Sequence, residues 1–347
     1  MQYLPLGNTD TSVSRLCLGT MTYGRQNSES EAHEQLNVAA EYGINFIDTA
    51  ELYPAPVEAD TGPLTETIVG SWLKQQPRDK FIVATKVVGP APKKWIGHIR
   101  GGPTLNDLQI EQALNDSLQR LQTDYIDLYQ VHWPARNTNF FGKLGYSVGR
   151  DKHDSPIIET LATLPRLQQS GKIRHIGVSN ETPWGLHQYL SAAAQLSVDN
   201  IVSIQNPYCL LNRTFEIGLA EFSHREHIGL LAYSPLAGGA LSGKYLHNQH
   251  PENARLTLYK NYFYRYTTEA AVHAVEAYTT VATRHGHDPA QMALAFVRQQ
   301  PFVNSTIVGA TDCSQLRSNI KSLHVTLDDD CLKEIQQIHQ RQPNPCP

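Results

Sequence analysis

Strand-like and helix-like segments alternate along most of this 347-residue chain. Eight short segments are rich in β-branched or aromatic residues and apolar on both faces, as parallel strands covered by helices are. In chain order they are RLCLGTM, NFIDTA, FIVATKV, YIDLYQVH, IRHIGVSN, IVSIQNPY, GLLAYSPL and STIVGA. Amphipathic segments lie between them. About eight such βα units in one run predict an α/β protein with a closed (β/α)8 TIM barrel.

An open, doubly wound parallel sheet would also give a βαβα pattern, and it stays open as an alternative. The first predicted strand, however, is not followed by the GxGxxG turn of a dinucleotide-binding sheet, which favours the barrel. Barrels of this length commonly fold as one unit. We therefore expect residues 1–347 to form a single domain.

Local signals predict several helix boundaries. Ser155 and Asp288 each precede a proline, as an N-cap residue before a proline at the first helical position does. Gly43 and Gly171 each follow an amphipathic segment, where a glycine commonly ends a helix.

Four segments fall outside the repeat. Residues 3–13 resemble a β-hairpin with a Gly7-Asn8 turn that would cap one end of the barrel. Residues 133–154 and 237–266 are predicted to be long loops on the carboxyl face, where long loops are usually functional. The segment DDDCLKEIQQIHQRQ predicts a last helix, followed by a frayed NPCP tail.

Composition and charge exclude several classes of protein. The formal net charge of −4 gives no basic field for nucleic acid. No run of eighteen apolar residues predicts a membrane span, and the N-terminus lacks the pattern of a signal peptide. The five scattered cysteines fit reduced thiols in a cytoplasmic protein. No cluster has metal-ligand spacing, so no metal site is expected.

Four reactive side chains lie at or just beyond the ends of three successive predicted strands. Asp48 and Tyr53 belong to GINFIDTAELY, Lys86 to FIVATKVV, and His132 to YIDLYQVHWP. The carboxyl ends of parallel strands meet at one face of a barrel, where such barrels hold their active sites. We therefore expect a carboxylate, a phenol, an amine and an imidazole to share one pocket.

Each of these side chains also has a purely structural explanation. Asp48 could cap a βα loop, Tyr53 could be an ordinary aromatic at the rim, and His132 could be a hydrogen-bonded core histidine. Lys86 is harder to explain in this way, because a buried lysine needs a partner and FIVATKVV offers none nearby. Taken together, the four residues favour a catalytic site.

A set of longer motifs carries a resemblance to a known family. They are LGTMTYG, GINFIDTAELY, ATKV, SLQRLQTDYIDLYQVHWP, GKIRHIGVSN, IQNPY, AYSPLAGGALSGKY and IVGATDCSQLRSNI. In this order, and over essentially the whole chain, they are similar to signatures of the aldo-keto reductase superfamily. The FGKLGY stretch at 141–146 resembles the bacterial Tas-like branch, which is related to the potassium-channel β-subunit group. The ordered set, rather than any one motif, carries the resemblance.

The resemblance implies reduction of a small-molecule carbonyl compound, an aldehyde or ketone, with NADPH/NADP+ as the cofactor. Tyr53 would be the general acid that protonates the carbonyl oxygen. Lys86 would stabilise the phenolate and lower the pKa of Tyr53, while Asp48 would keep Lys86 charged and oriented. His132 would hydrogen-bond the substrate oxygen.

The resemblance also implies a cofactor cleft. Ser179, Asn180 and Gln205 would clamp the nicotinamide, and Tyr233 would stack on its ring. As isolated residues they could equally be strand-end caps and a core tyrosine. The full set of expected cofactor-binding residues is Thr20, Met21, Asp48, Ser179, Asn180, Gln205, Tyr233, Ser234, Pro235, Leu236, Gly238, Lys244, Arg255, Gly309, Thr311, Gln315 and Asn319.

Preference for NADPH over NADH would rest on Lys244, Arg255 and Gln315, although a lysine and an arginine taken alone would be surface charges. The family often has glutamate one residue before Asn319. This chain has Ser318 there, which weakens the expected contact with adenine.

The substrate pocket is expected to be walled by Tyr23, Trp95 and Trp133, together with Met21 and the 137–150 loop. Two alternatives to the reductase are a slow-turnover regulatory or redox-sensing NADPH binder and an unrelated barrel enzyme with a Schiff base at Lys86. The complete set of four residues favours the reductase. Neither nucleic acid nor a membrane is an expected partner, and a monomer or weak homo-oligomer is expected.

Overall fold

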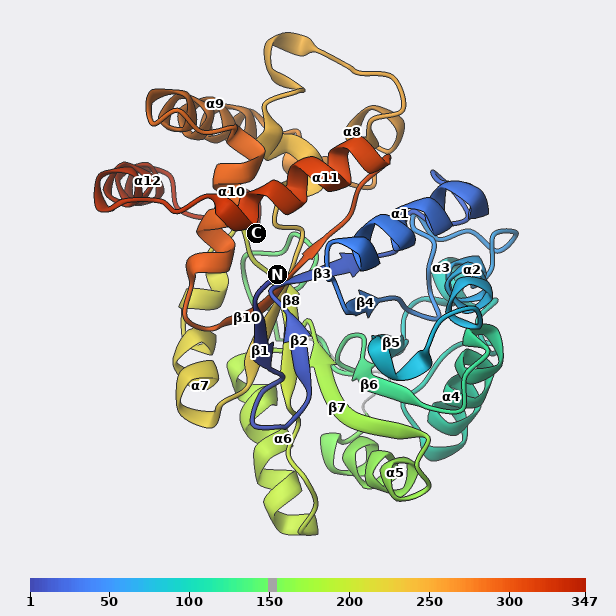
Figure 1. Cartoon of the computed structure of the whole chain (residues 1–347). Helices are drawn as coiled ribbons and strands as arrows, with labels where there is room; N and C mark the ends of the chain where they lie inside the picture. The colour runs from blue at the N-terminus through green and yellow to red at the C-terminus, as the bar shows by residue number, and fades with distance from the viewer. Residues whose placement is uncertain (149–154) are drawn as a thin grey trace.

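In the computed structural model, which describes residues 1–148 and 155–347, eight parallel strands close into a barrel (Figure 1). Around the barrel their order is β10-β3-β4-β5-β6-β7-β8-β9. The strands are β3 (Leu16–Gly19), β4 (Phe46–Asp48), β5 (Ile82–Val87), β6 (Ile126–Val131), β7 (Ile173–Ser179), β8 (Ser203–Pro207), β9 (Gly229–Tyr233) and β10 (Val303–Val308). Every predicted strand is confirmed, and closure of the sheet rules out the open alternative.

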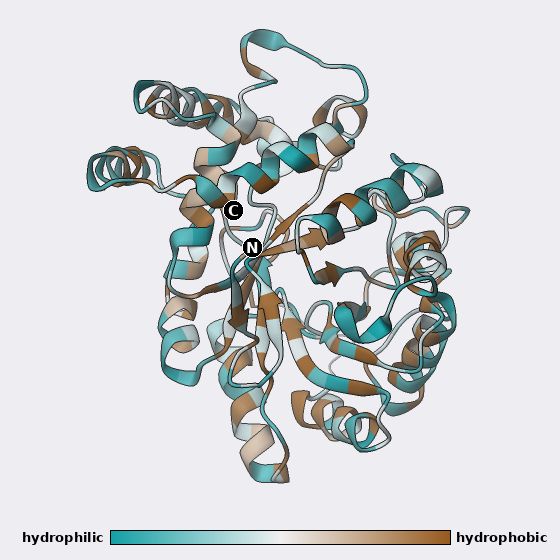
Figure 2. Ribbon diagram, viewed as in Figure 1, coloured by the Kyte–Doolittle hydropathy of each residue, from teal (hydrophilic) through white to brown (hydrophobic). Residues whose placement is uncertain are grey.

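Helices connect the strands and surround the barrel (Figure 1). They are α1 (Glu29–Glu41), α2 (Leu64–Leu73), α3 (Lys93–Ile96), α4 (Asp107–Leu121), α5 (Ile157–Gln169), α6 (Pro183–Leu196), α7 (Leu219–Glu226), α8 (Arg255–Leu258), α9 (Glu269–Arg284), α10 (Pro289–Gln299), α11 (Cys313–Lys321) and α12 (Asp329–Arg341). Apolar residues concentrate on the strands, and the helices show hydrophilic faces outward (Figure 2). Among the described residues, no helix combines the length and the apolar character that crossing a membrane requires.

The predicted N-terminal hairpin is confirmed. Strand β1 (Tyr3–Pro5) pairs antiparallel with β2 (Ser12–Ser14), and Gly7 lies in the connection with φ +58°. A Cβ at Gly7 would lie 2.3 Å from the carbonyl oxygen of Val202, so this close approach requires glycine. Leu6 and Val13 are fully buried against residues of the barrel interior, so the hairpin closes one end of the barrel.

The helix-boundary predictions have mixed outcomes. Asp288 caps α10 as predicted, because its Oδ1 accepts the N–H of Gln291 at 2.9 Å. Gly43 and Gly171 follow α1 and α5 with φ +80° and +77°. The N-cap at Ser155 is wrong: Pro156 is extended (ψ 137°), α5 begins only at Ile157, and no side chain of the described residues caps it.

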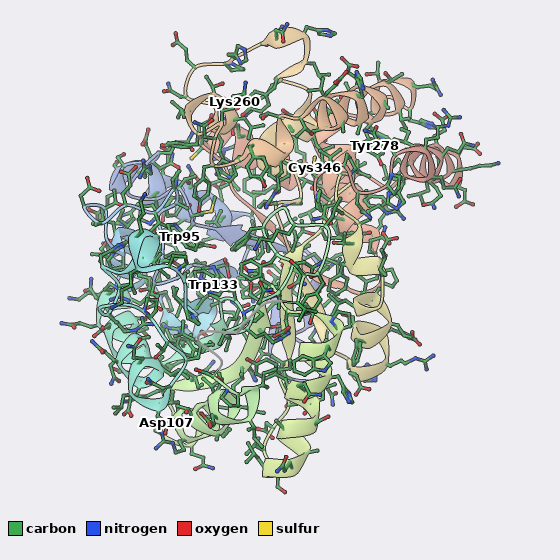
Figure 3. All side chains as sticks on the ribbon, turned by 180° about the vertical axis from the view of Figure 1, so that it is seen from behind. Trp95, Asp107, Trp133, Lys260, Tyr278 and Cys346 are labelled. Carbon is green, nitrogen blue, oxygen red and sulfur yellow. The ribbon has the colours of Figure 1, made fainter. Side chains whose placement is uncertain are left out.

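The last helix, α12, is confirmed, but the frayed tail is wrong. Cys346 is fully buried, and its N–H donates to the carbonyl oxygen of Leu211 at 3.0 Å. Asn344 accepts the N–H of Arg213 at 2.7 Å. The tail is held in place because the β8–α7 connection offers it backbone partners and an apolar site, and Cys346 lies inside the fold in Figure 3.

The two segments predicted to be long loops on the carboxyl face differ from each other. Residues 237–266 contain α8 and 3₁₀ segments at Ala237–Ser242, Leu246–Asn248 and Tyr264–Tyr266, so this segment is more structured than a plain loop. Residues 133–148 form an irregular loop, and the rest of the predicted 133–154 loop, residues 149–154, lies outside the described residues.

Candidate active site

The strand ends bring the four reactive side chains together. Asp48 is the last residue of β4, Lys86 lies one residue before the end of β5, and His132 directly follows β6. Tyr53 lies on the β4–α2 connection. Asp48, Tyr53 and His132 line a cavity of about 580 Å³ at the carboxyl face, and Lys86 lies beneath it, fully buried.

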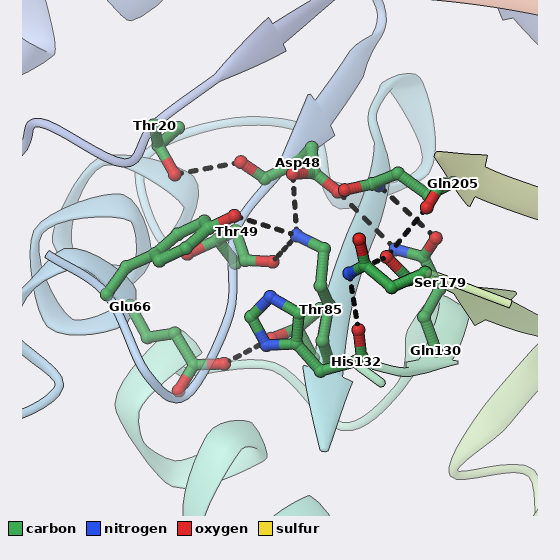
Figure 4. A network of polar contacts seen from close by, with 12 residues as sticks. Thr20, Asp48, Thr49, Glu66, Thr85, Gln130, His132, Ser179 and Gln205 are labelled. Atoms are coloured by element: carbon green, nitrogen blue, oxygen red, sulfur yellow. Dashed lines mark hydrogen bonds and ion pairs between the residues drawn. The ribbon is translucent and has the colours of Figure 1, made fainter. Parts of the chain in front are cut away.

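Three oxygen atoms surround the Lys86 ammonium (Figure 4). Its Nζ donates to Asp48 Oδ2 at 2.7 Å and to the carbonyl oxygen of Thr49 at 2.8 Å. The hydroxyl of Tyr53 lies 3.4 Å from the same nitrogen. A buried ammonium with three donors is thereby fully satisfied, with one of its hydrogens directed at the Tyr53 hydroxyl.

The second oxygen of Asp48 is held by two amides. Its Oδ1 accepts from Gln205 Nε2 at 2.8 Å and from Gln130 Nε2 at 3.4 Å. Gln130 was not predicted from the sequence, because a glutamine within an apolar strand gives no signal of its neighbours across the barrel. Asp48 thus has a fixed orientation toward Lys86.

Burial and charge set the protonation states of Lys86 and Tyr53. Burial alone would lower the pKa of Lys86, but Asp48 and then Tyr53 outweigh it and raise that pKa, so Lys86 stays charged. Burial raises the pKa of Tyr53, and Lys86 opposes this. The expectation that Lys86 would lower the Tyr53 pKa is thus right about the effect of Lys86 and wrong about the net direction. The phenol keeps its proton at neutral pH and is available as a donor.

His132 is neutral at physiological pH. Burial, and secondly the Lys86 charge, hold the pKa of His132 well below its usual range. Its ring meets the Tyr53 ring edge-on, with centroids 5.9 Å apart. Its Nδ1 is buried with no hydrogen-bond partner among the described residues. A neutral imidazole carries one N–H and can donate a hydrogen bond to a carbonyl oxygen.

A second hydrogen-bonded group adjoins the first along β7, β8 and β9. Ser179 Oγ donates to the carbonyl oxygen of Gln205 at 2.8 Å. Asn180 Nδ2 donates to the carbonyl oxygen of His132 at 2.9 Å, and Tyr233 donates its hydroxyl hydrogen to Asn180 Oδ1 at 2.7 Å. The residues expected to clamp the nicotinamide therefore lie side by side on the cavity wall and are linked to Asp48 and His132.

Comparison with known proteins agrees with this arrangement. The model of the aldo/keto reductase family matches residues 15–340. The chain belongs to the aldo/keto reductase family. It is 53% identical to "Protein tas" of Escherichia coli over the full length of both chains. It is also 31% identical to an E. coli protein named NADH-specific methylglyoxal reductase, over 95% of each chain. A probable voltage-gated potassium channel subunit beta of Arabidopsis thaliana is 29% identical over 99% of this chain and 98% of its own.

Membership in the aldo/keto reductase family makes the chain an oxidoreductase, and the family uses nicotinamide cofactors. The far half of the cavity fits such a group. Lys244 and Arg255 line it, and neither forms an ion pair with a carboxylate among the described residues. Burial lowers the pKa of both side chains, and for Lys244 the neighbouring Arg255 lowers it further. Two unpaired, partly buried cations indicate a site for an anionic group such as phosphate.

The last βα turn of this aldo/keto reductase supplies polar groups to the same end of the cavity. Gln315 Nε2 donates to Thr311 Oγ1 at 2.6 Å, and Asn319 Nδ2 lies 3.4 Å from the carbonyl oxygen of Gly309. Ser318, where the sequence departs from the family pattern, lines the cavity as well.

The structure brings nearly all the sequence-predicted residues to this one cavity. Those that line it are Thr20, Met21, Asp48, Tyr53, Trp95, His132, Trp133, Ser179, Asn180, Gln205, Tyr233, Ser234, Pro235, Leu236, Gly238, Lys244, Arg255, Gly309, Thr311, Gln315 and Asn319. Two predicted site residues do not line it: Lys86 lies beneath the cavity, and Tyr23 is a correction. It is fully buried away from the cavity, and its hydroxyl donates to Gln35 at 3.3 Å, because the chain turns after Met21 and directs Tyr23 toward α1.

Aromatic side chains enclose the substrate end of the cavity. Trp95 and Trp133 are labelled near each other in Figure 3. Their rings stack, with centroids 5.5 Å apart and planes at 17°. Phe141, from the 137–150 loop, meets Trp133 edge-on at 6.3 Å; residues 149 and 150 of that loop are outside the described residues. The lining residues that sequence reasoning missed include Leu52, Tyr262, Phe263, Tyr264 and Arg265. The tyrosine run at 259–266 was a visible signal, but nothing in it indicated which rings face the cavity.

The described residues contain no group of three or more His, Cys, Asp and Glu side chains that could hold a metal ion.

Proposed function

We propose that this oxidoreductase reduces aldehydes or ketones with NADPH and that Tyr53 is the general acid. The observation that carries the proposal is the placement of the Lys86 ammonium, 3.4 Å from the Tyr53 hydroxyl and ion-paired to Asp48, directly beneath the cavity. A phenol with a cation at this distance can release a proton to a substrate oxygen and be stabilised as the phenolate that remains.

When bound, the cofactor would supply the hydride. Ser179, Asn180 and Gln205 would hold its carboxamide, and Tyr233 would pack against its ring. Lys244 and Arg255 would bind its phosphate groups through charge-assisted hydrogen bonds. These residues would thereby hold the cofactor in the cavity that Tyr53 and His132 also line.

Proton transfer is the task of the chain itself. As charge develops on the carbonyl oxygen, Tyr53 donates its hydroxyl proton to it. Lys86 stays charged and stabilises the phenolate, and Asp48 holds Lys86 in place. His132, which is neutral, donates a hydrogen bond to the same oxygen and orients the carbonyl group.

The preference for NADPH over NADH is also part of the proposal. It rests on the two unpaired cations Lys244 and Arg255 and on the nearby Gln315, which suit an additional phosphate. A relative of 31% identity is named as NADH-specific, so membership in the family does not decide this point.

The test is a steady-state assay of NADPH oxidation with a panel of aldehydes, ketones, quinones and sugars. We expect saturable turnover with at least one class of carbonyl compound and a lower Michaelis constant for NADPH than for NADH. Turnover below about 1 per minute with every compound, together with tight NADPH binding, would instead favour the second candidate described next.

That second candidate is a regulatory or redox-sensing NADPH binder with slow turnover. Full-length similarity to a protein named as a probable channel subunit favours it. The complete set of Asp48, Tyr53, Lys86 and His132 favours the reductase, because a binder has no need of a proton donor.

A Schiff base at Lys86 fits the geometry poorly. Lys86 is fully buried and does not line the cavity, and its ammonium is engaged by Asp48 and Thr49. A lysine nucleophile must be neutral and reach the carbonyl carbon. Failure of borohydride to trap a carbonyl substrate on the protein is the expected result.

A further inference from the structure

A buried carboxylate beside Tyr53 connects three segments around the cavity. Glu51 lies two residues before Tyr53, and its Oε1 accepts the N–H of Val88 at 2.6 Å. Its Oε2 pairs with Arg100, and the side chains of both residues are only 4% exposed. Glu51 thus ties the connection that carries Tyr53 to the end of β5 and to residues 89–105, which we call the 89–105 loop.

This ion pair is poorly arranged for stability alone. Burial raises the pKa of Glu51, and Arg100 opposes this. Two nitrogens of the Arg100 guanidinium, Nε and Nη2, are buried with no hydrogen-bond partner among the described residues. A buried pair whose donors are not all satisfied is often no more stable than apolar residues of the same size. We therefore look for the role of the Glu51–Arg100 pair in the segments that it holds in position.

Arg100 is connected to the cavity wall by a continuous series of turns in the 89–105 loop. The N–H of Trp95 donates to the carbonyl oxygen of Pro92 at 2.8 Å, that of Ile99 to Ile96 at 3.0 Å, and that of Gly102 to Ile99 at 2.9 Å. These turns make the segment from Trp95 to Arg100 a short, stiff unit. The Arg100 contact therefore restrains the backbone that carries Trp95.

The ring of Trp95 stacks on Trp133, the residue that follows His132. Trp133 in turn donates from Nε1 to the carbonyl oxygen of Pro90 at 3.0 Å, which anchors the start of the 89–105 loop. Arg100 anchors its end. Gln109 also holds the end of the loop, at Gly102 and Thr104, but Arg100 is the side-chain anchor nearest to Trp95 on that side. Loss of the Arg100 contact would therefore loosen the part of the loop that carries the Trp95 ring.

We propose that Glu51 and Arg100 are positioning residues that hold Trp95 against Trp133 and thereby determine the affinity for carbonyl substrates large enough to contact this aromatic wall. Neither belongs to the described residues that line the cavity. The substrate part of the inference rests on the proposed reductase function; the placement of Trp95 does not.

A positioning role and a catalytic role of Glu51 would give different kinetic results. The pKa of Tyr53 responds mainly to burial, Lys86, Asp48 and Arg255, and Glu51 is not among these largest causes. Removal of the Glu51 charge should therefore leave the pH dependence of turnover unchanged and act on the Michaelis constant of large substrates.

The test compares Glu51→Gln, Arg100→Met and the milder Arg100→Lys with Trp95→Phe as a reference. Asp127→Asn is the matched control, because Asp127 is also a fully buried carboxylate, paired with Arg78 and Arg174 at the start of β6, far along the strand from the cavity. Each variant is assayed with 2-naphthaldehyde and with propanal. Near-ultraviolet circular dichroism reports the Trp95–Trp133 stack without any turnover.

We expect Glu51→Gln and Arg100→Met to raise the Michaelis constant for 2-naphthaldehyde about 10-fold and to change kcat for propanal less than about 2-fold. Both should lose the part of the dichroism signal that Trp95→Phe loses, Arg100→Lys should recover part of it, and Asp127→Asn should keep it. An unchanged tryptophan signal in Arg100→Lys and Arg100→Met, or equal losses with both aldehydes, would overturn the proposal. If the wild type reduced neither aldehyde, the substrate part of the inference would fail, whereas the proposed function would fail only if no carbonyl compound of the panel were reduced; the dichroism would still decide the positioning role.

Discussion

The Nζ of Lys86 and the Oδ2 of Asp48 lie 2.7 Å apart, with side chains 0% and 3% exposed. Two charges so deeply buried are costly to remove from water, and their attraction compensates for this only when the geometry is good. The geometry here is good, since Gln205 and Gln130 hold the other carboxylate oxygen. The pair keeps a permanent positive charge beneath a phenol that burial alone would make a very weak acid.

Replacement of Tyr53 by phenylalanine tests the general acid. We expect Tyr53→Phe to reduce carbonyl turnover by about 10²–10⁴-fold, because the positioned proton donor is lost, while the ring still fills its place and NADPH affinity stays nearly the same. Stopped-flow and steady-state measurements on one good substrate give the comparison. Tyr129→Phe is the matched control, because the Tyr129 hydroxyl is buried with no hydrogen-bond partner among the described residues. Near wild-type turnover in Tyr53→Phe would mean that the proton comes from elsewhere.

The depressed pKa of His132 predicts a pH dependence of stability. In the unfolded chain a histidine titrates near pH ~6.5, whereas burial and Lys86 keep folded His132 neutral well below that. Between these two pKa values the unfolded state alone binds the proton, so falling pH lowers the free energy of unfolding, by at most about 1.4 kcal/mol per pH unit.

His132→Gln removes this titration. Urea unfolding of both proteins at pH 7.5, 6.0 and 5.0 should therefore show that the stability advantage of the wild type over the variant shrinks as the pH falls. A difference that does not depend on pH would show that His132 titrates normally in the folded protein.

Replacement of Arg255 by methionine tests the proposed cofactor site. Loss of one charge-assisted hydrogen bond costs about 1.5–3 kcal/mol, so Arg255→Met should weaken NADPH binding about 10- to 150-fold and NADH binding far less. Quenching of tryptophan fluorescence measures both dissociation constants. Arg225→Met is the control, since Arg225 is an exposed arginine paired with Glu221 on α7. Equal weakening for both cofactors would place Arg255 at a phosphate that NADH also carries.

The barrel and most of the site could be predicted from the sequence because they depend on the pattern of apolar and polar residues within short segments. Apolar runs specify strands, strand ends converge in a closed barrel, and so Asp48, Lys86 and His132 had to lie near one another. The prediction that Tyr23 walls the substrate pocket was wrong, because a turn of only two residues after Met21 decides whether this side chain faces the cavity or α1. The prediction that Ser155 is an N-cap was wrong, because a proline can occupy the N-cap position itself as well as the first turn.

The sequence did not reveal contacts between residues that lie far apart in the chain. Gln130 and Gln205 meet Asp48 only across the barrel, and Arg100 meets Glu51 only through the course of an irregular loop. The buried tail at Cys346 is of the same kind, because its composition resembles that of a frayed end and only its docking site makes it ordered. The net pKa of Tyr53 could not be predicted either, since it depends on how completely the phenol is buried.

The contact between Lys86 and Asp48 leads to a test that does not depend on substrate. Lys86→Met leaves the Asp48 carboxylate buried without its cation, and Asp48→Asn leaves the ammonium with only neutral acceptors. Removing one member of a fully buried pair destabilises the protein by about 3–5 kcal/mol, and by less where water enters from the cavity.

The double variant of Lys86 and Asp48 removes both charges. It should therefore be more stable than the sum of the two single losses predicts. It should still be inactive, because nothing then stabilises the Tyr53 phenolate. Thermal melts of the four proteins give the interaction energy directly. Arg166→Met with Asp107→Asn, an exposed pair at 3.2 Å, is the control in which the losses should simply add. Additive losses at Lys86 and Asp48 as well would mean that the two side chains do not stabilise each other and that the proposed role of Lys86 at Tyr53 is wrong.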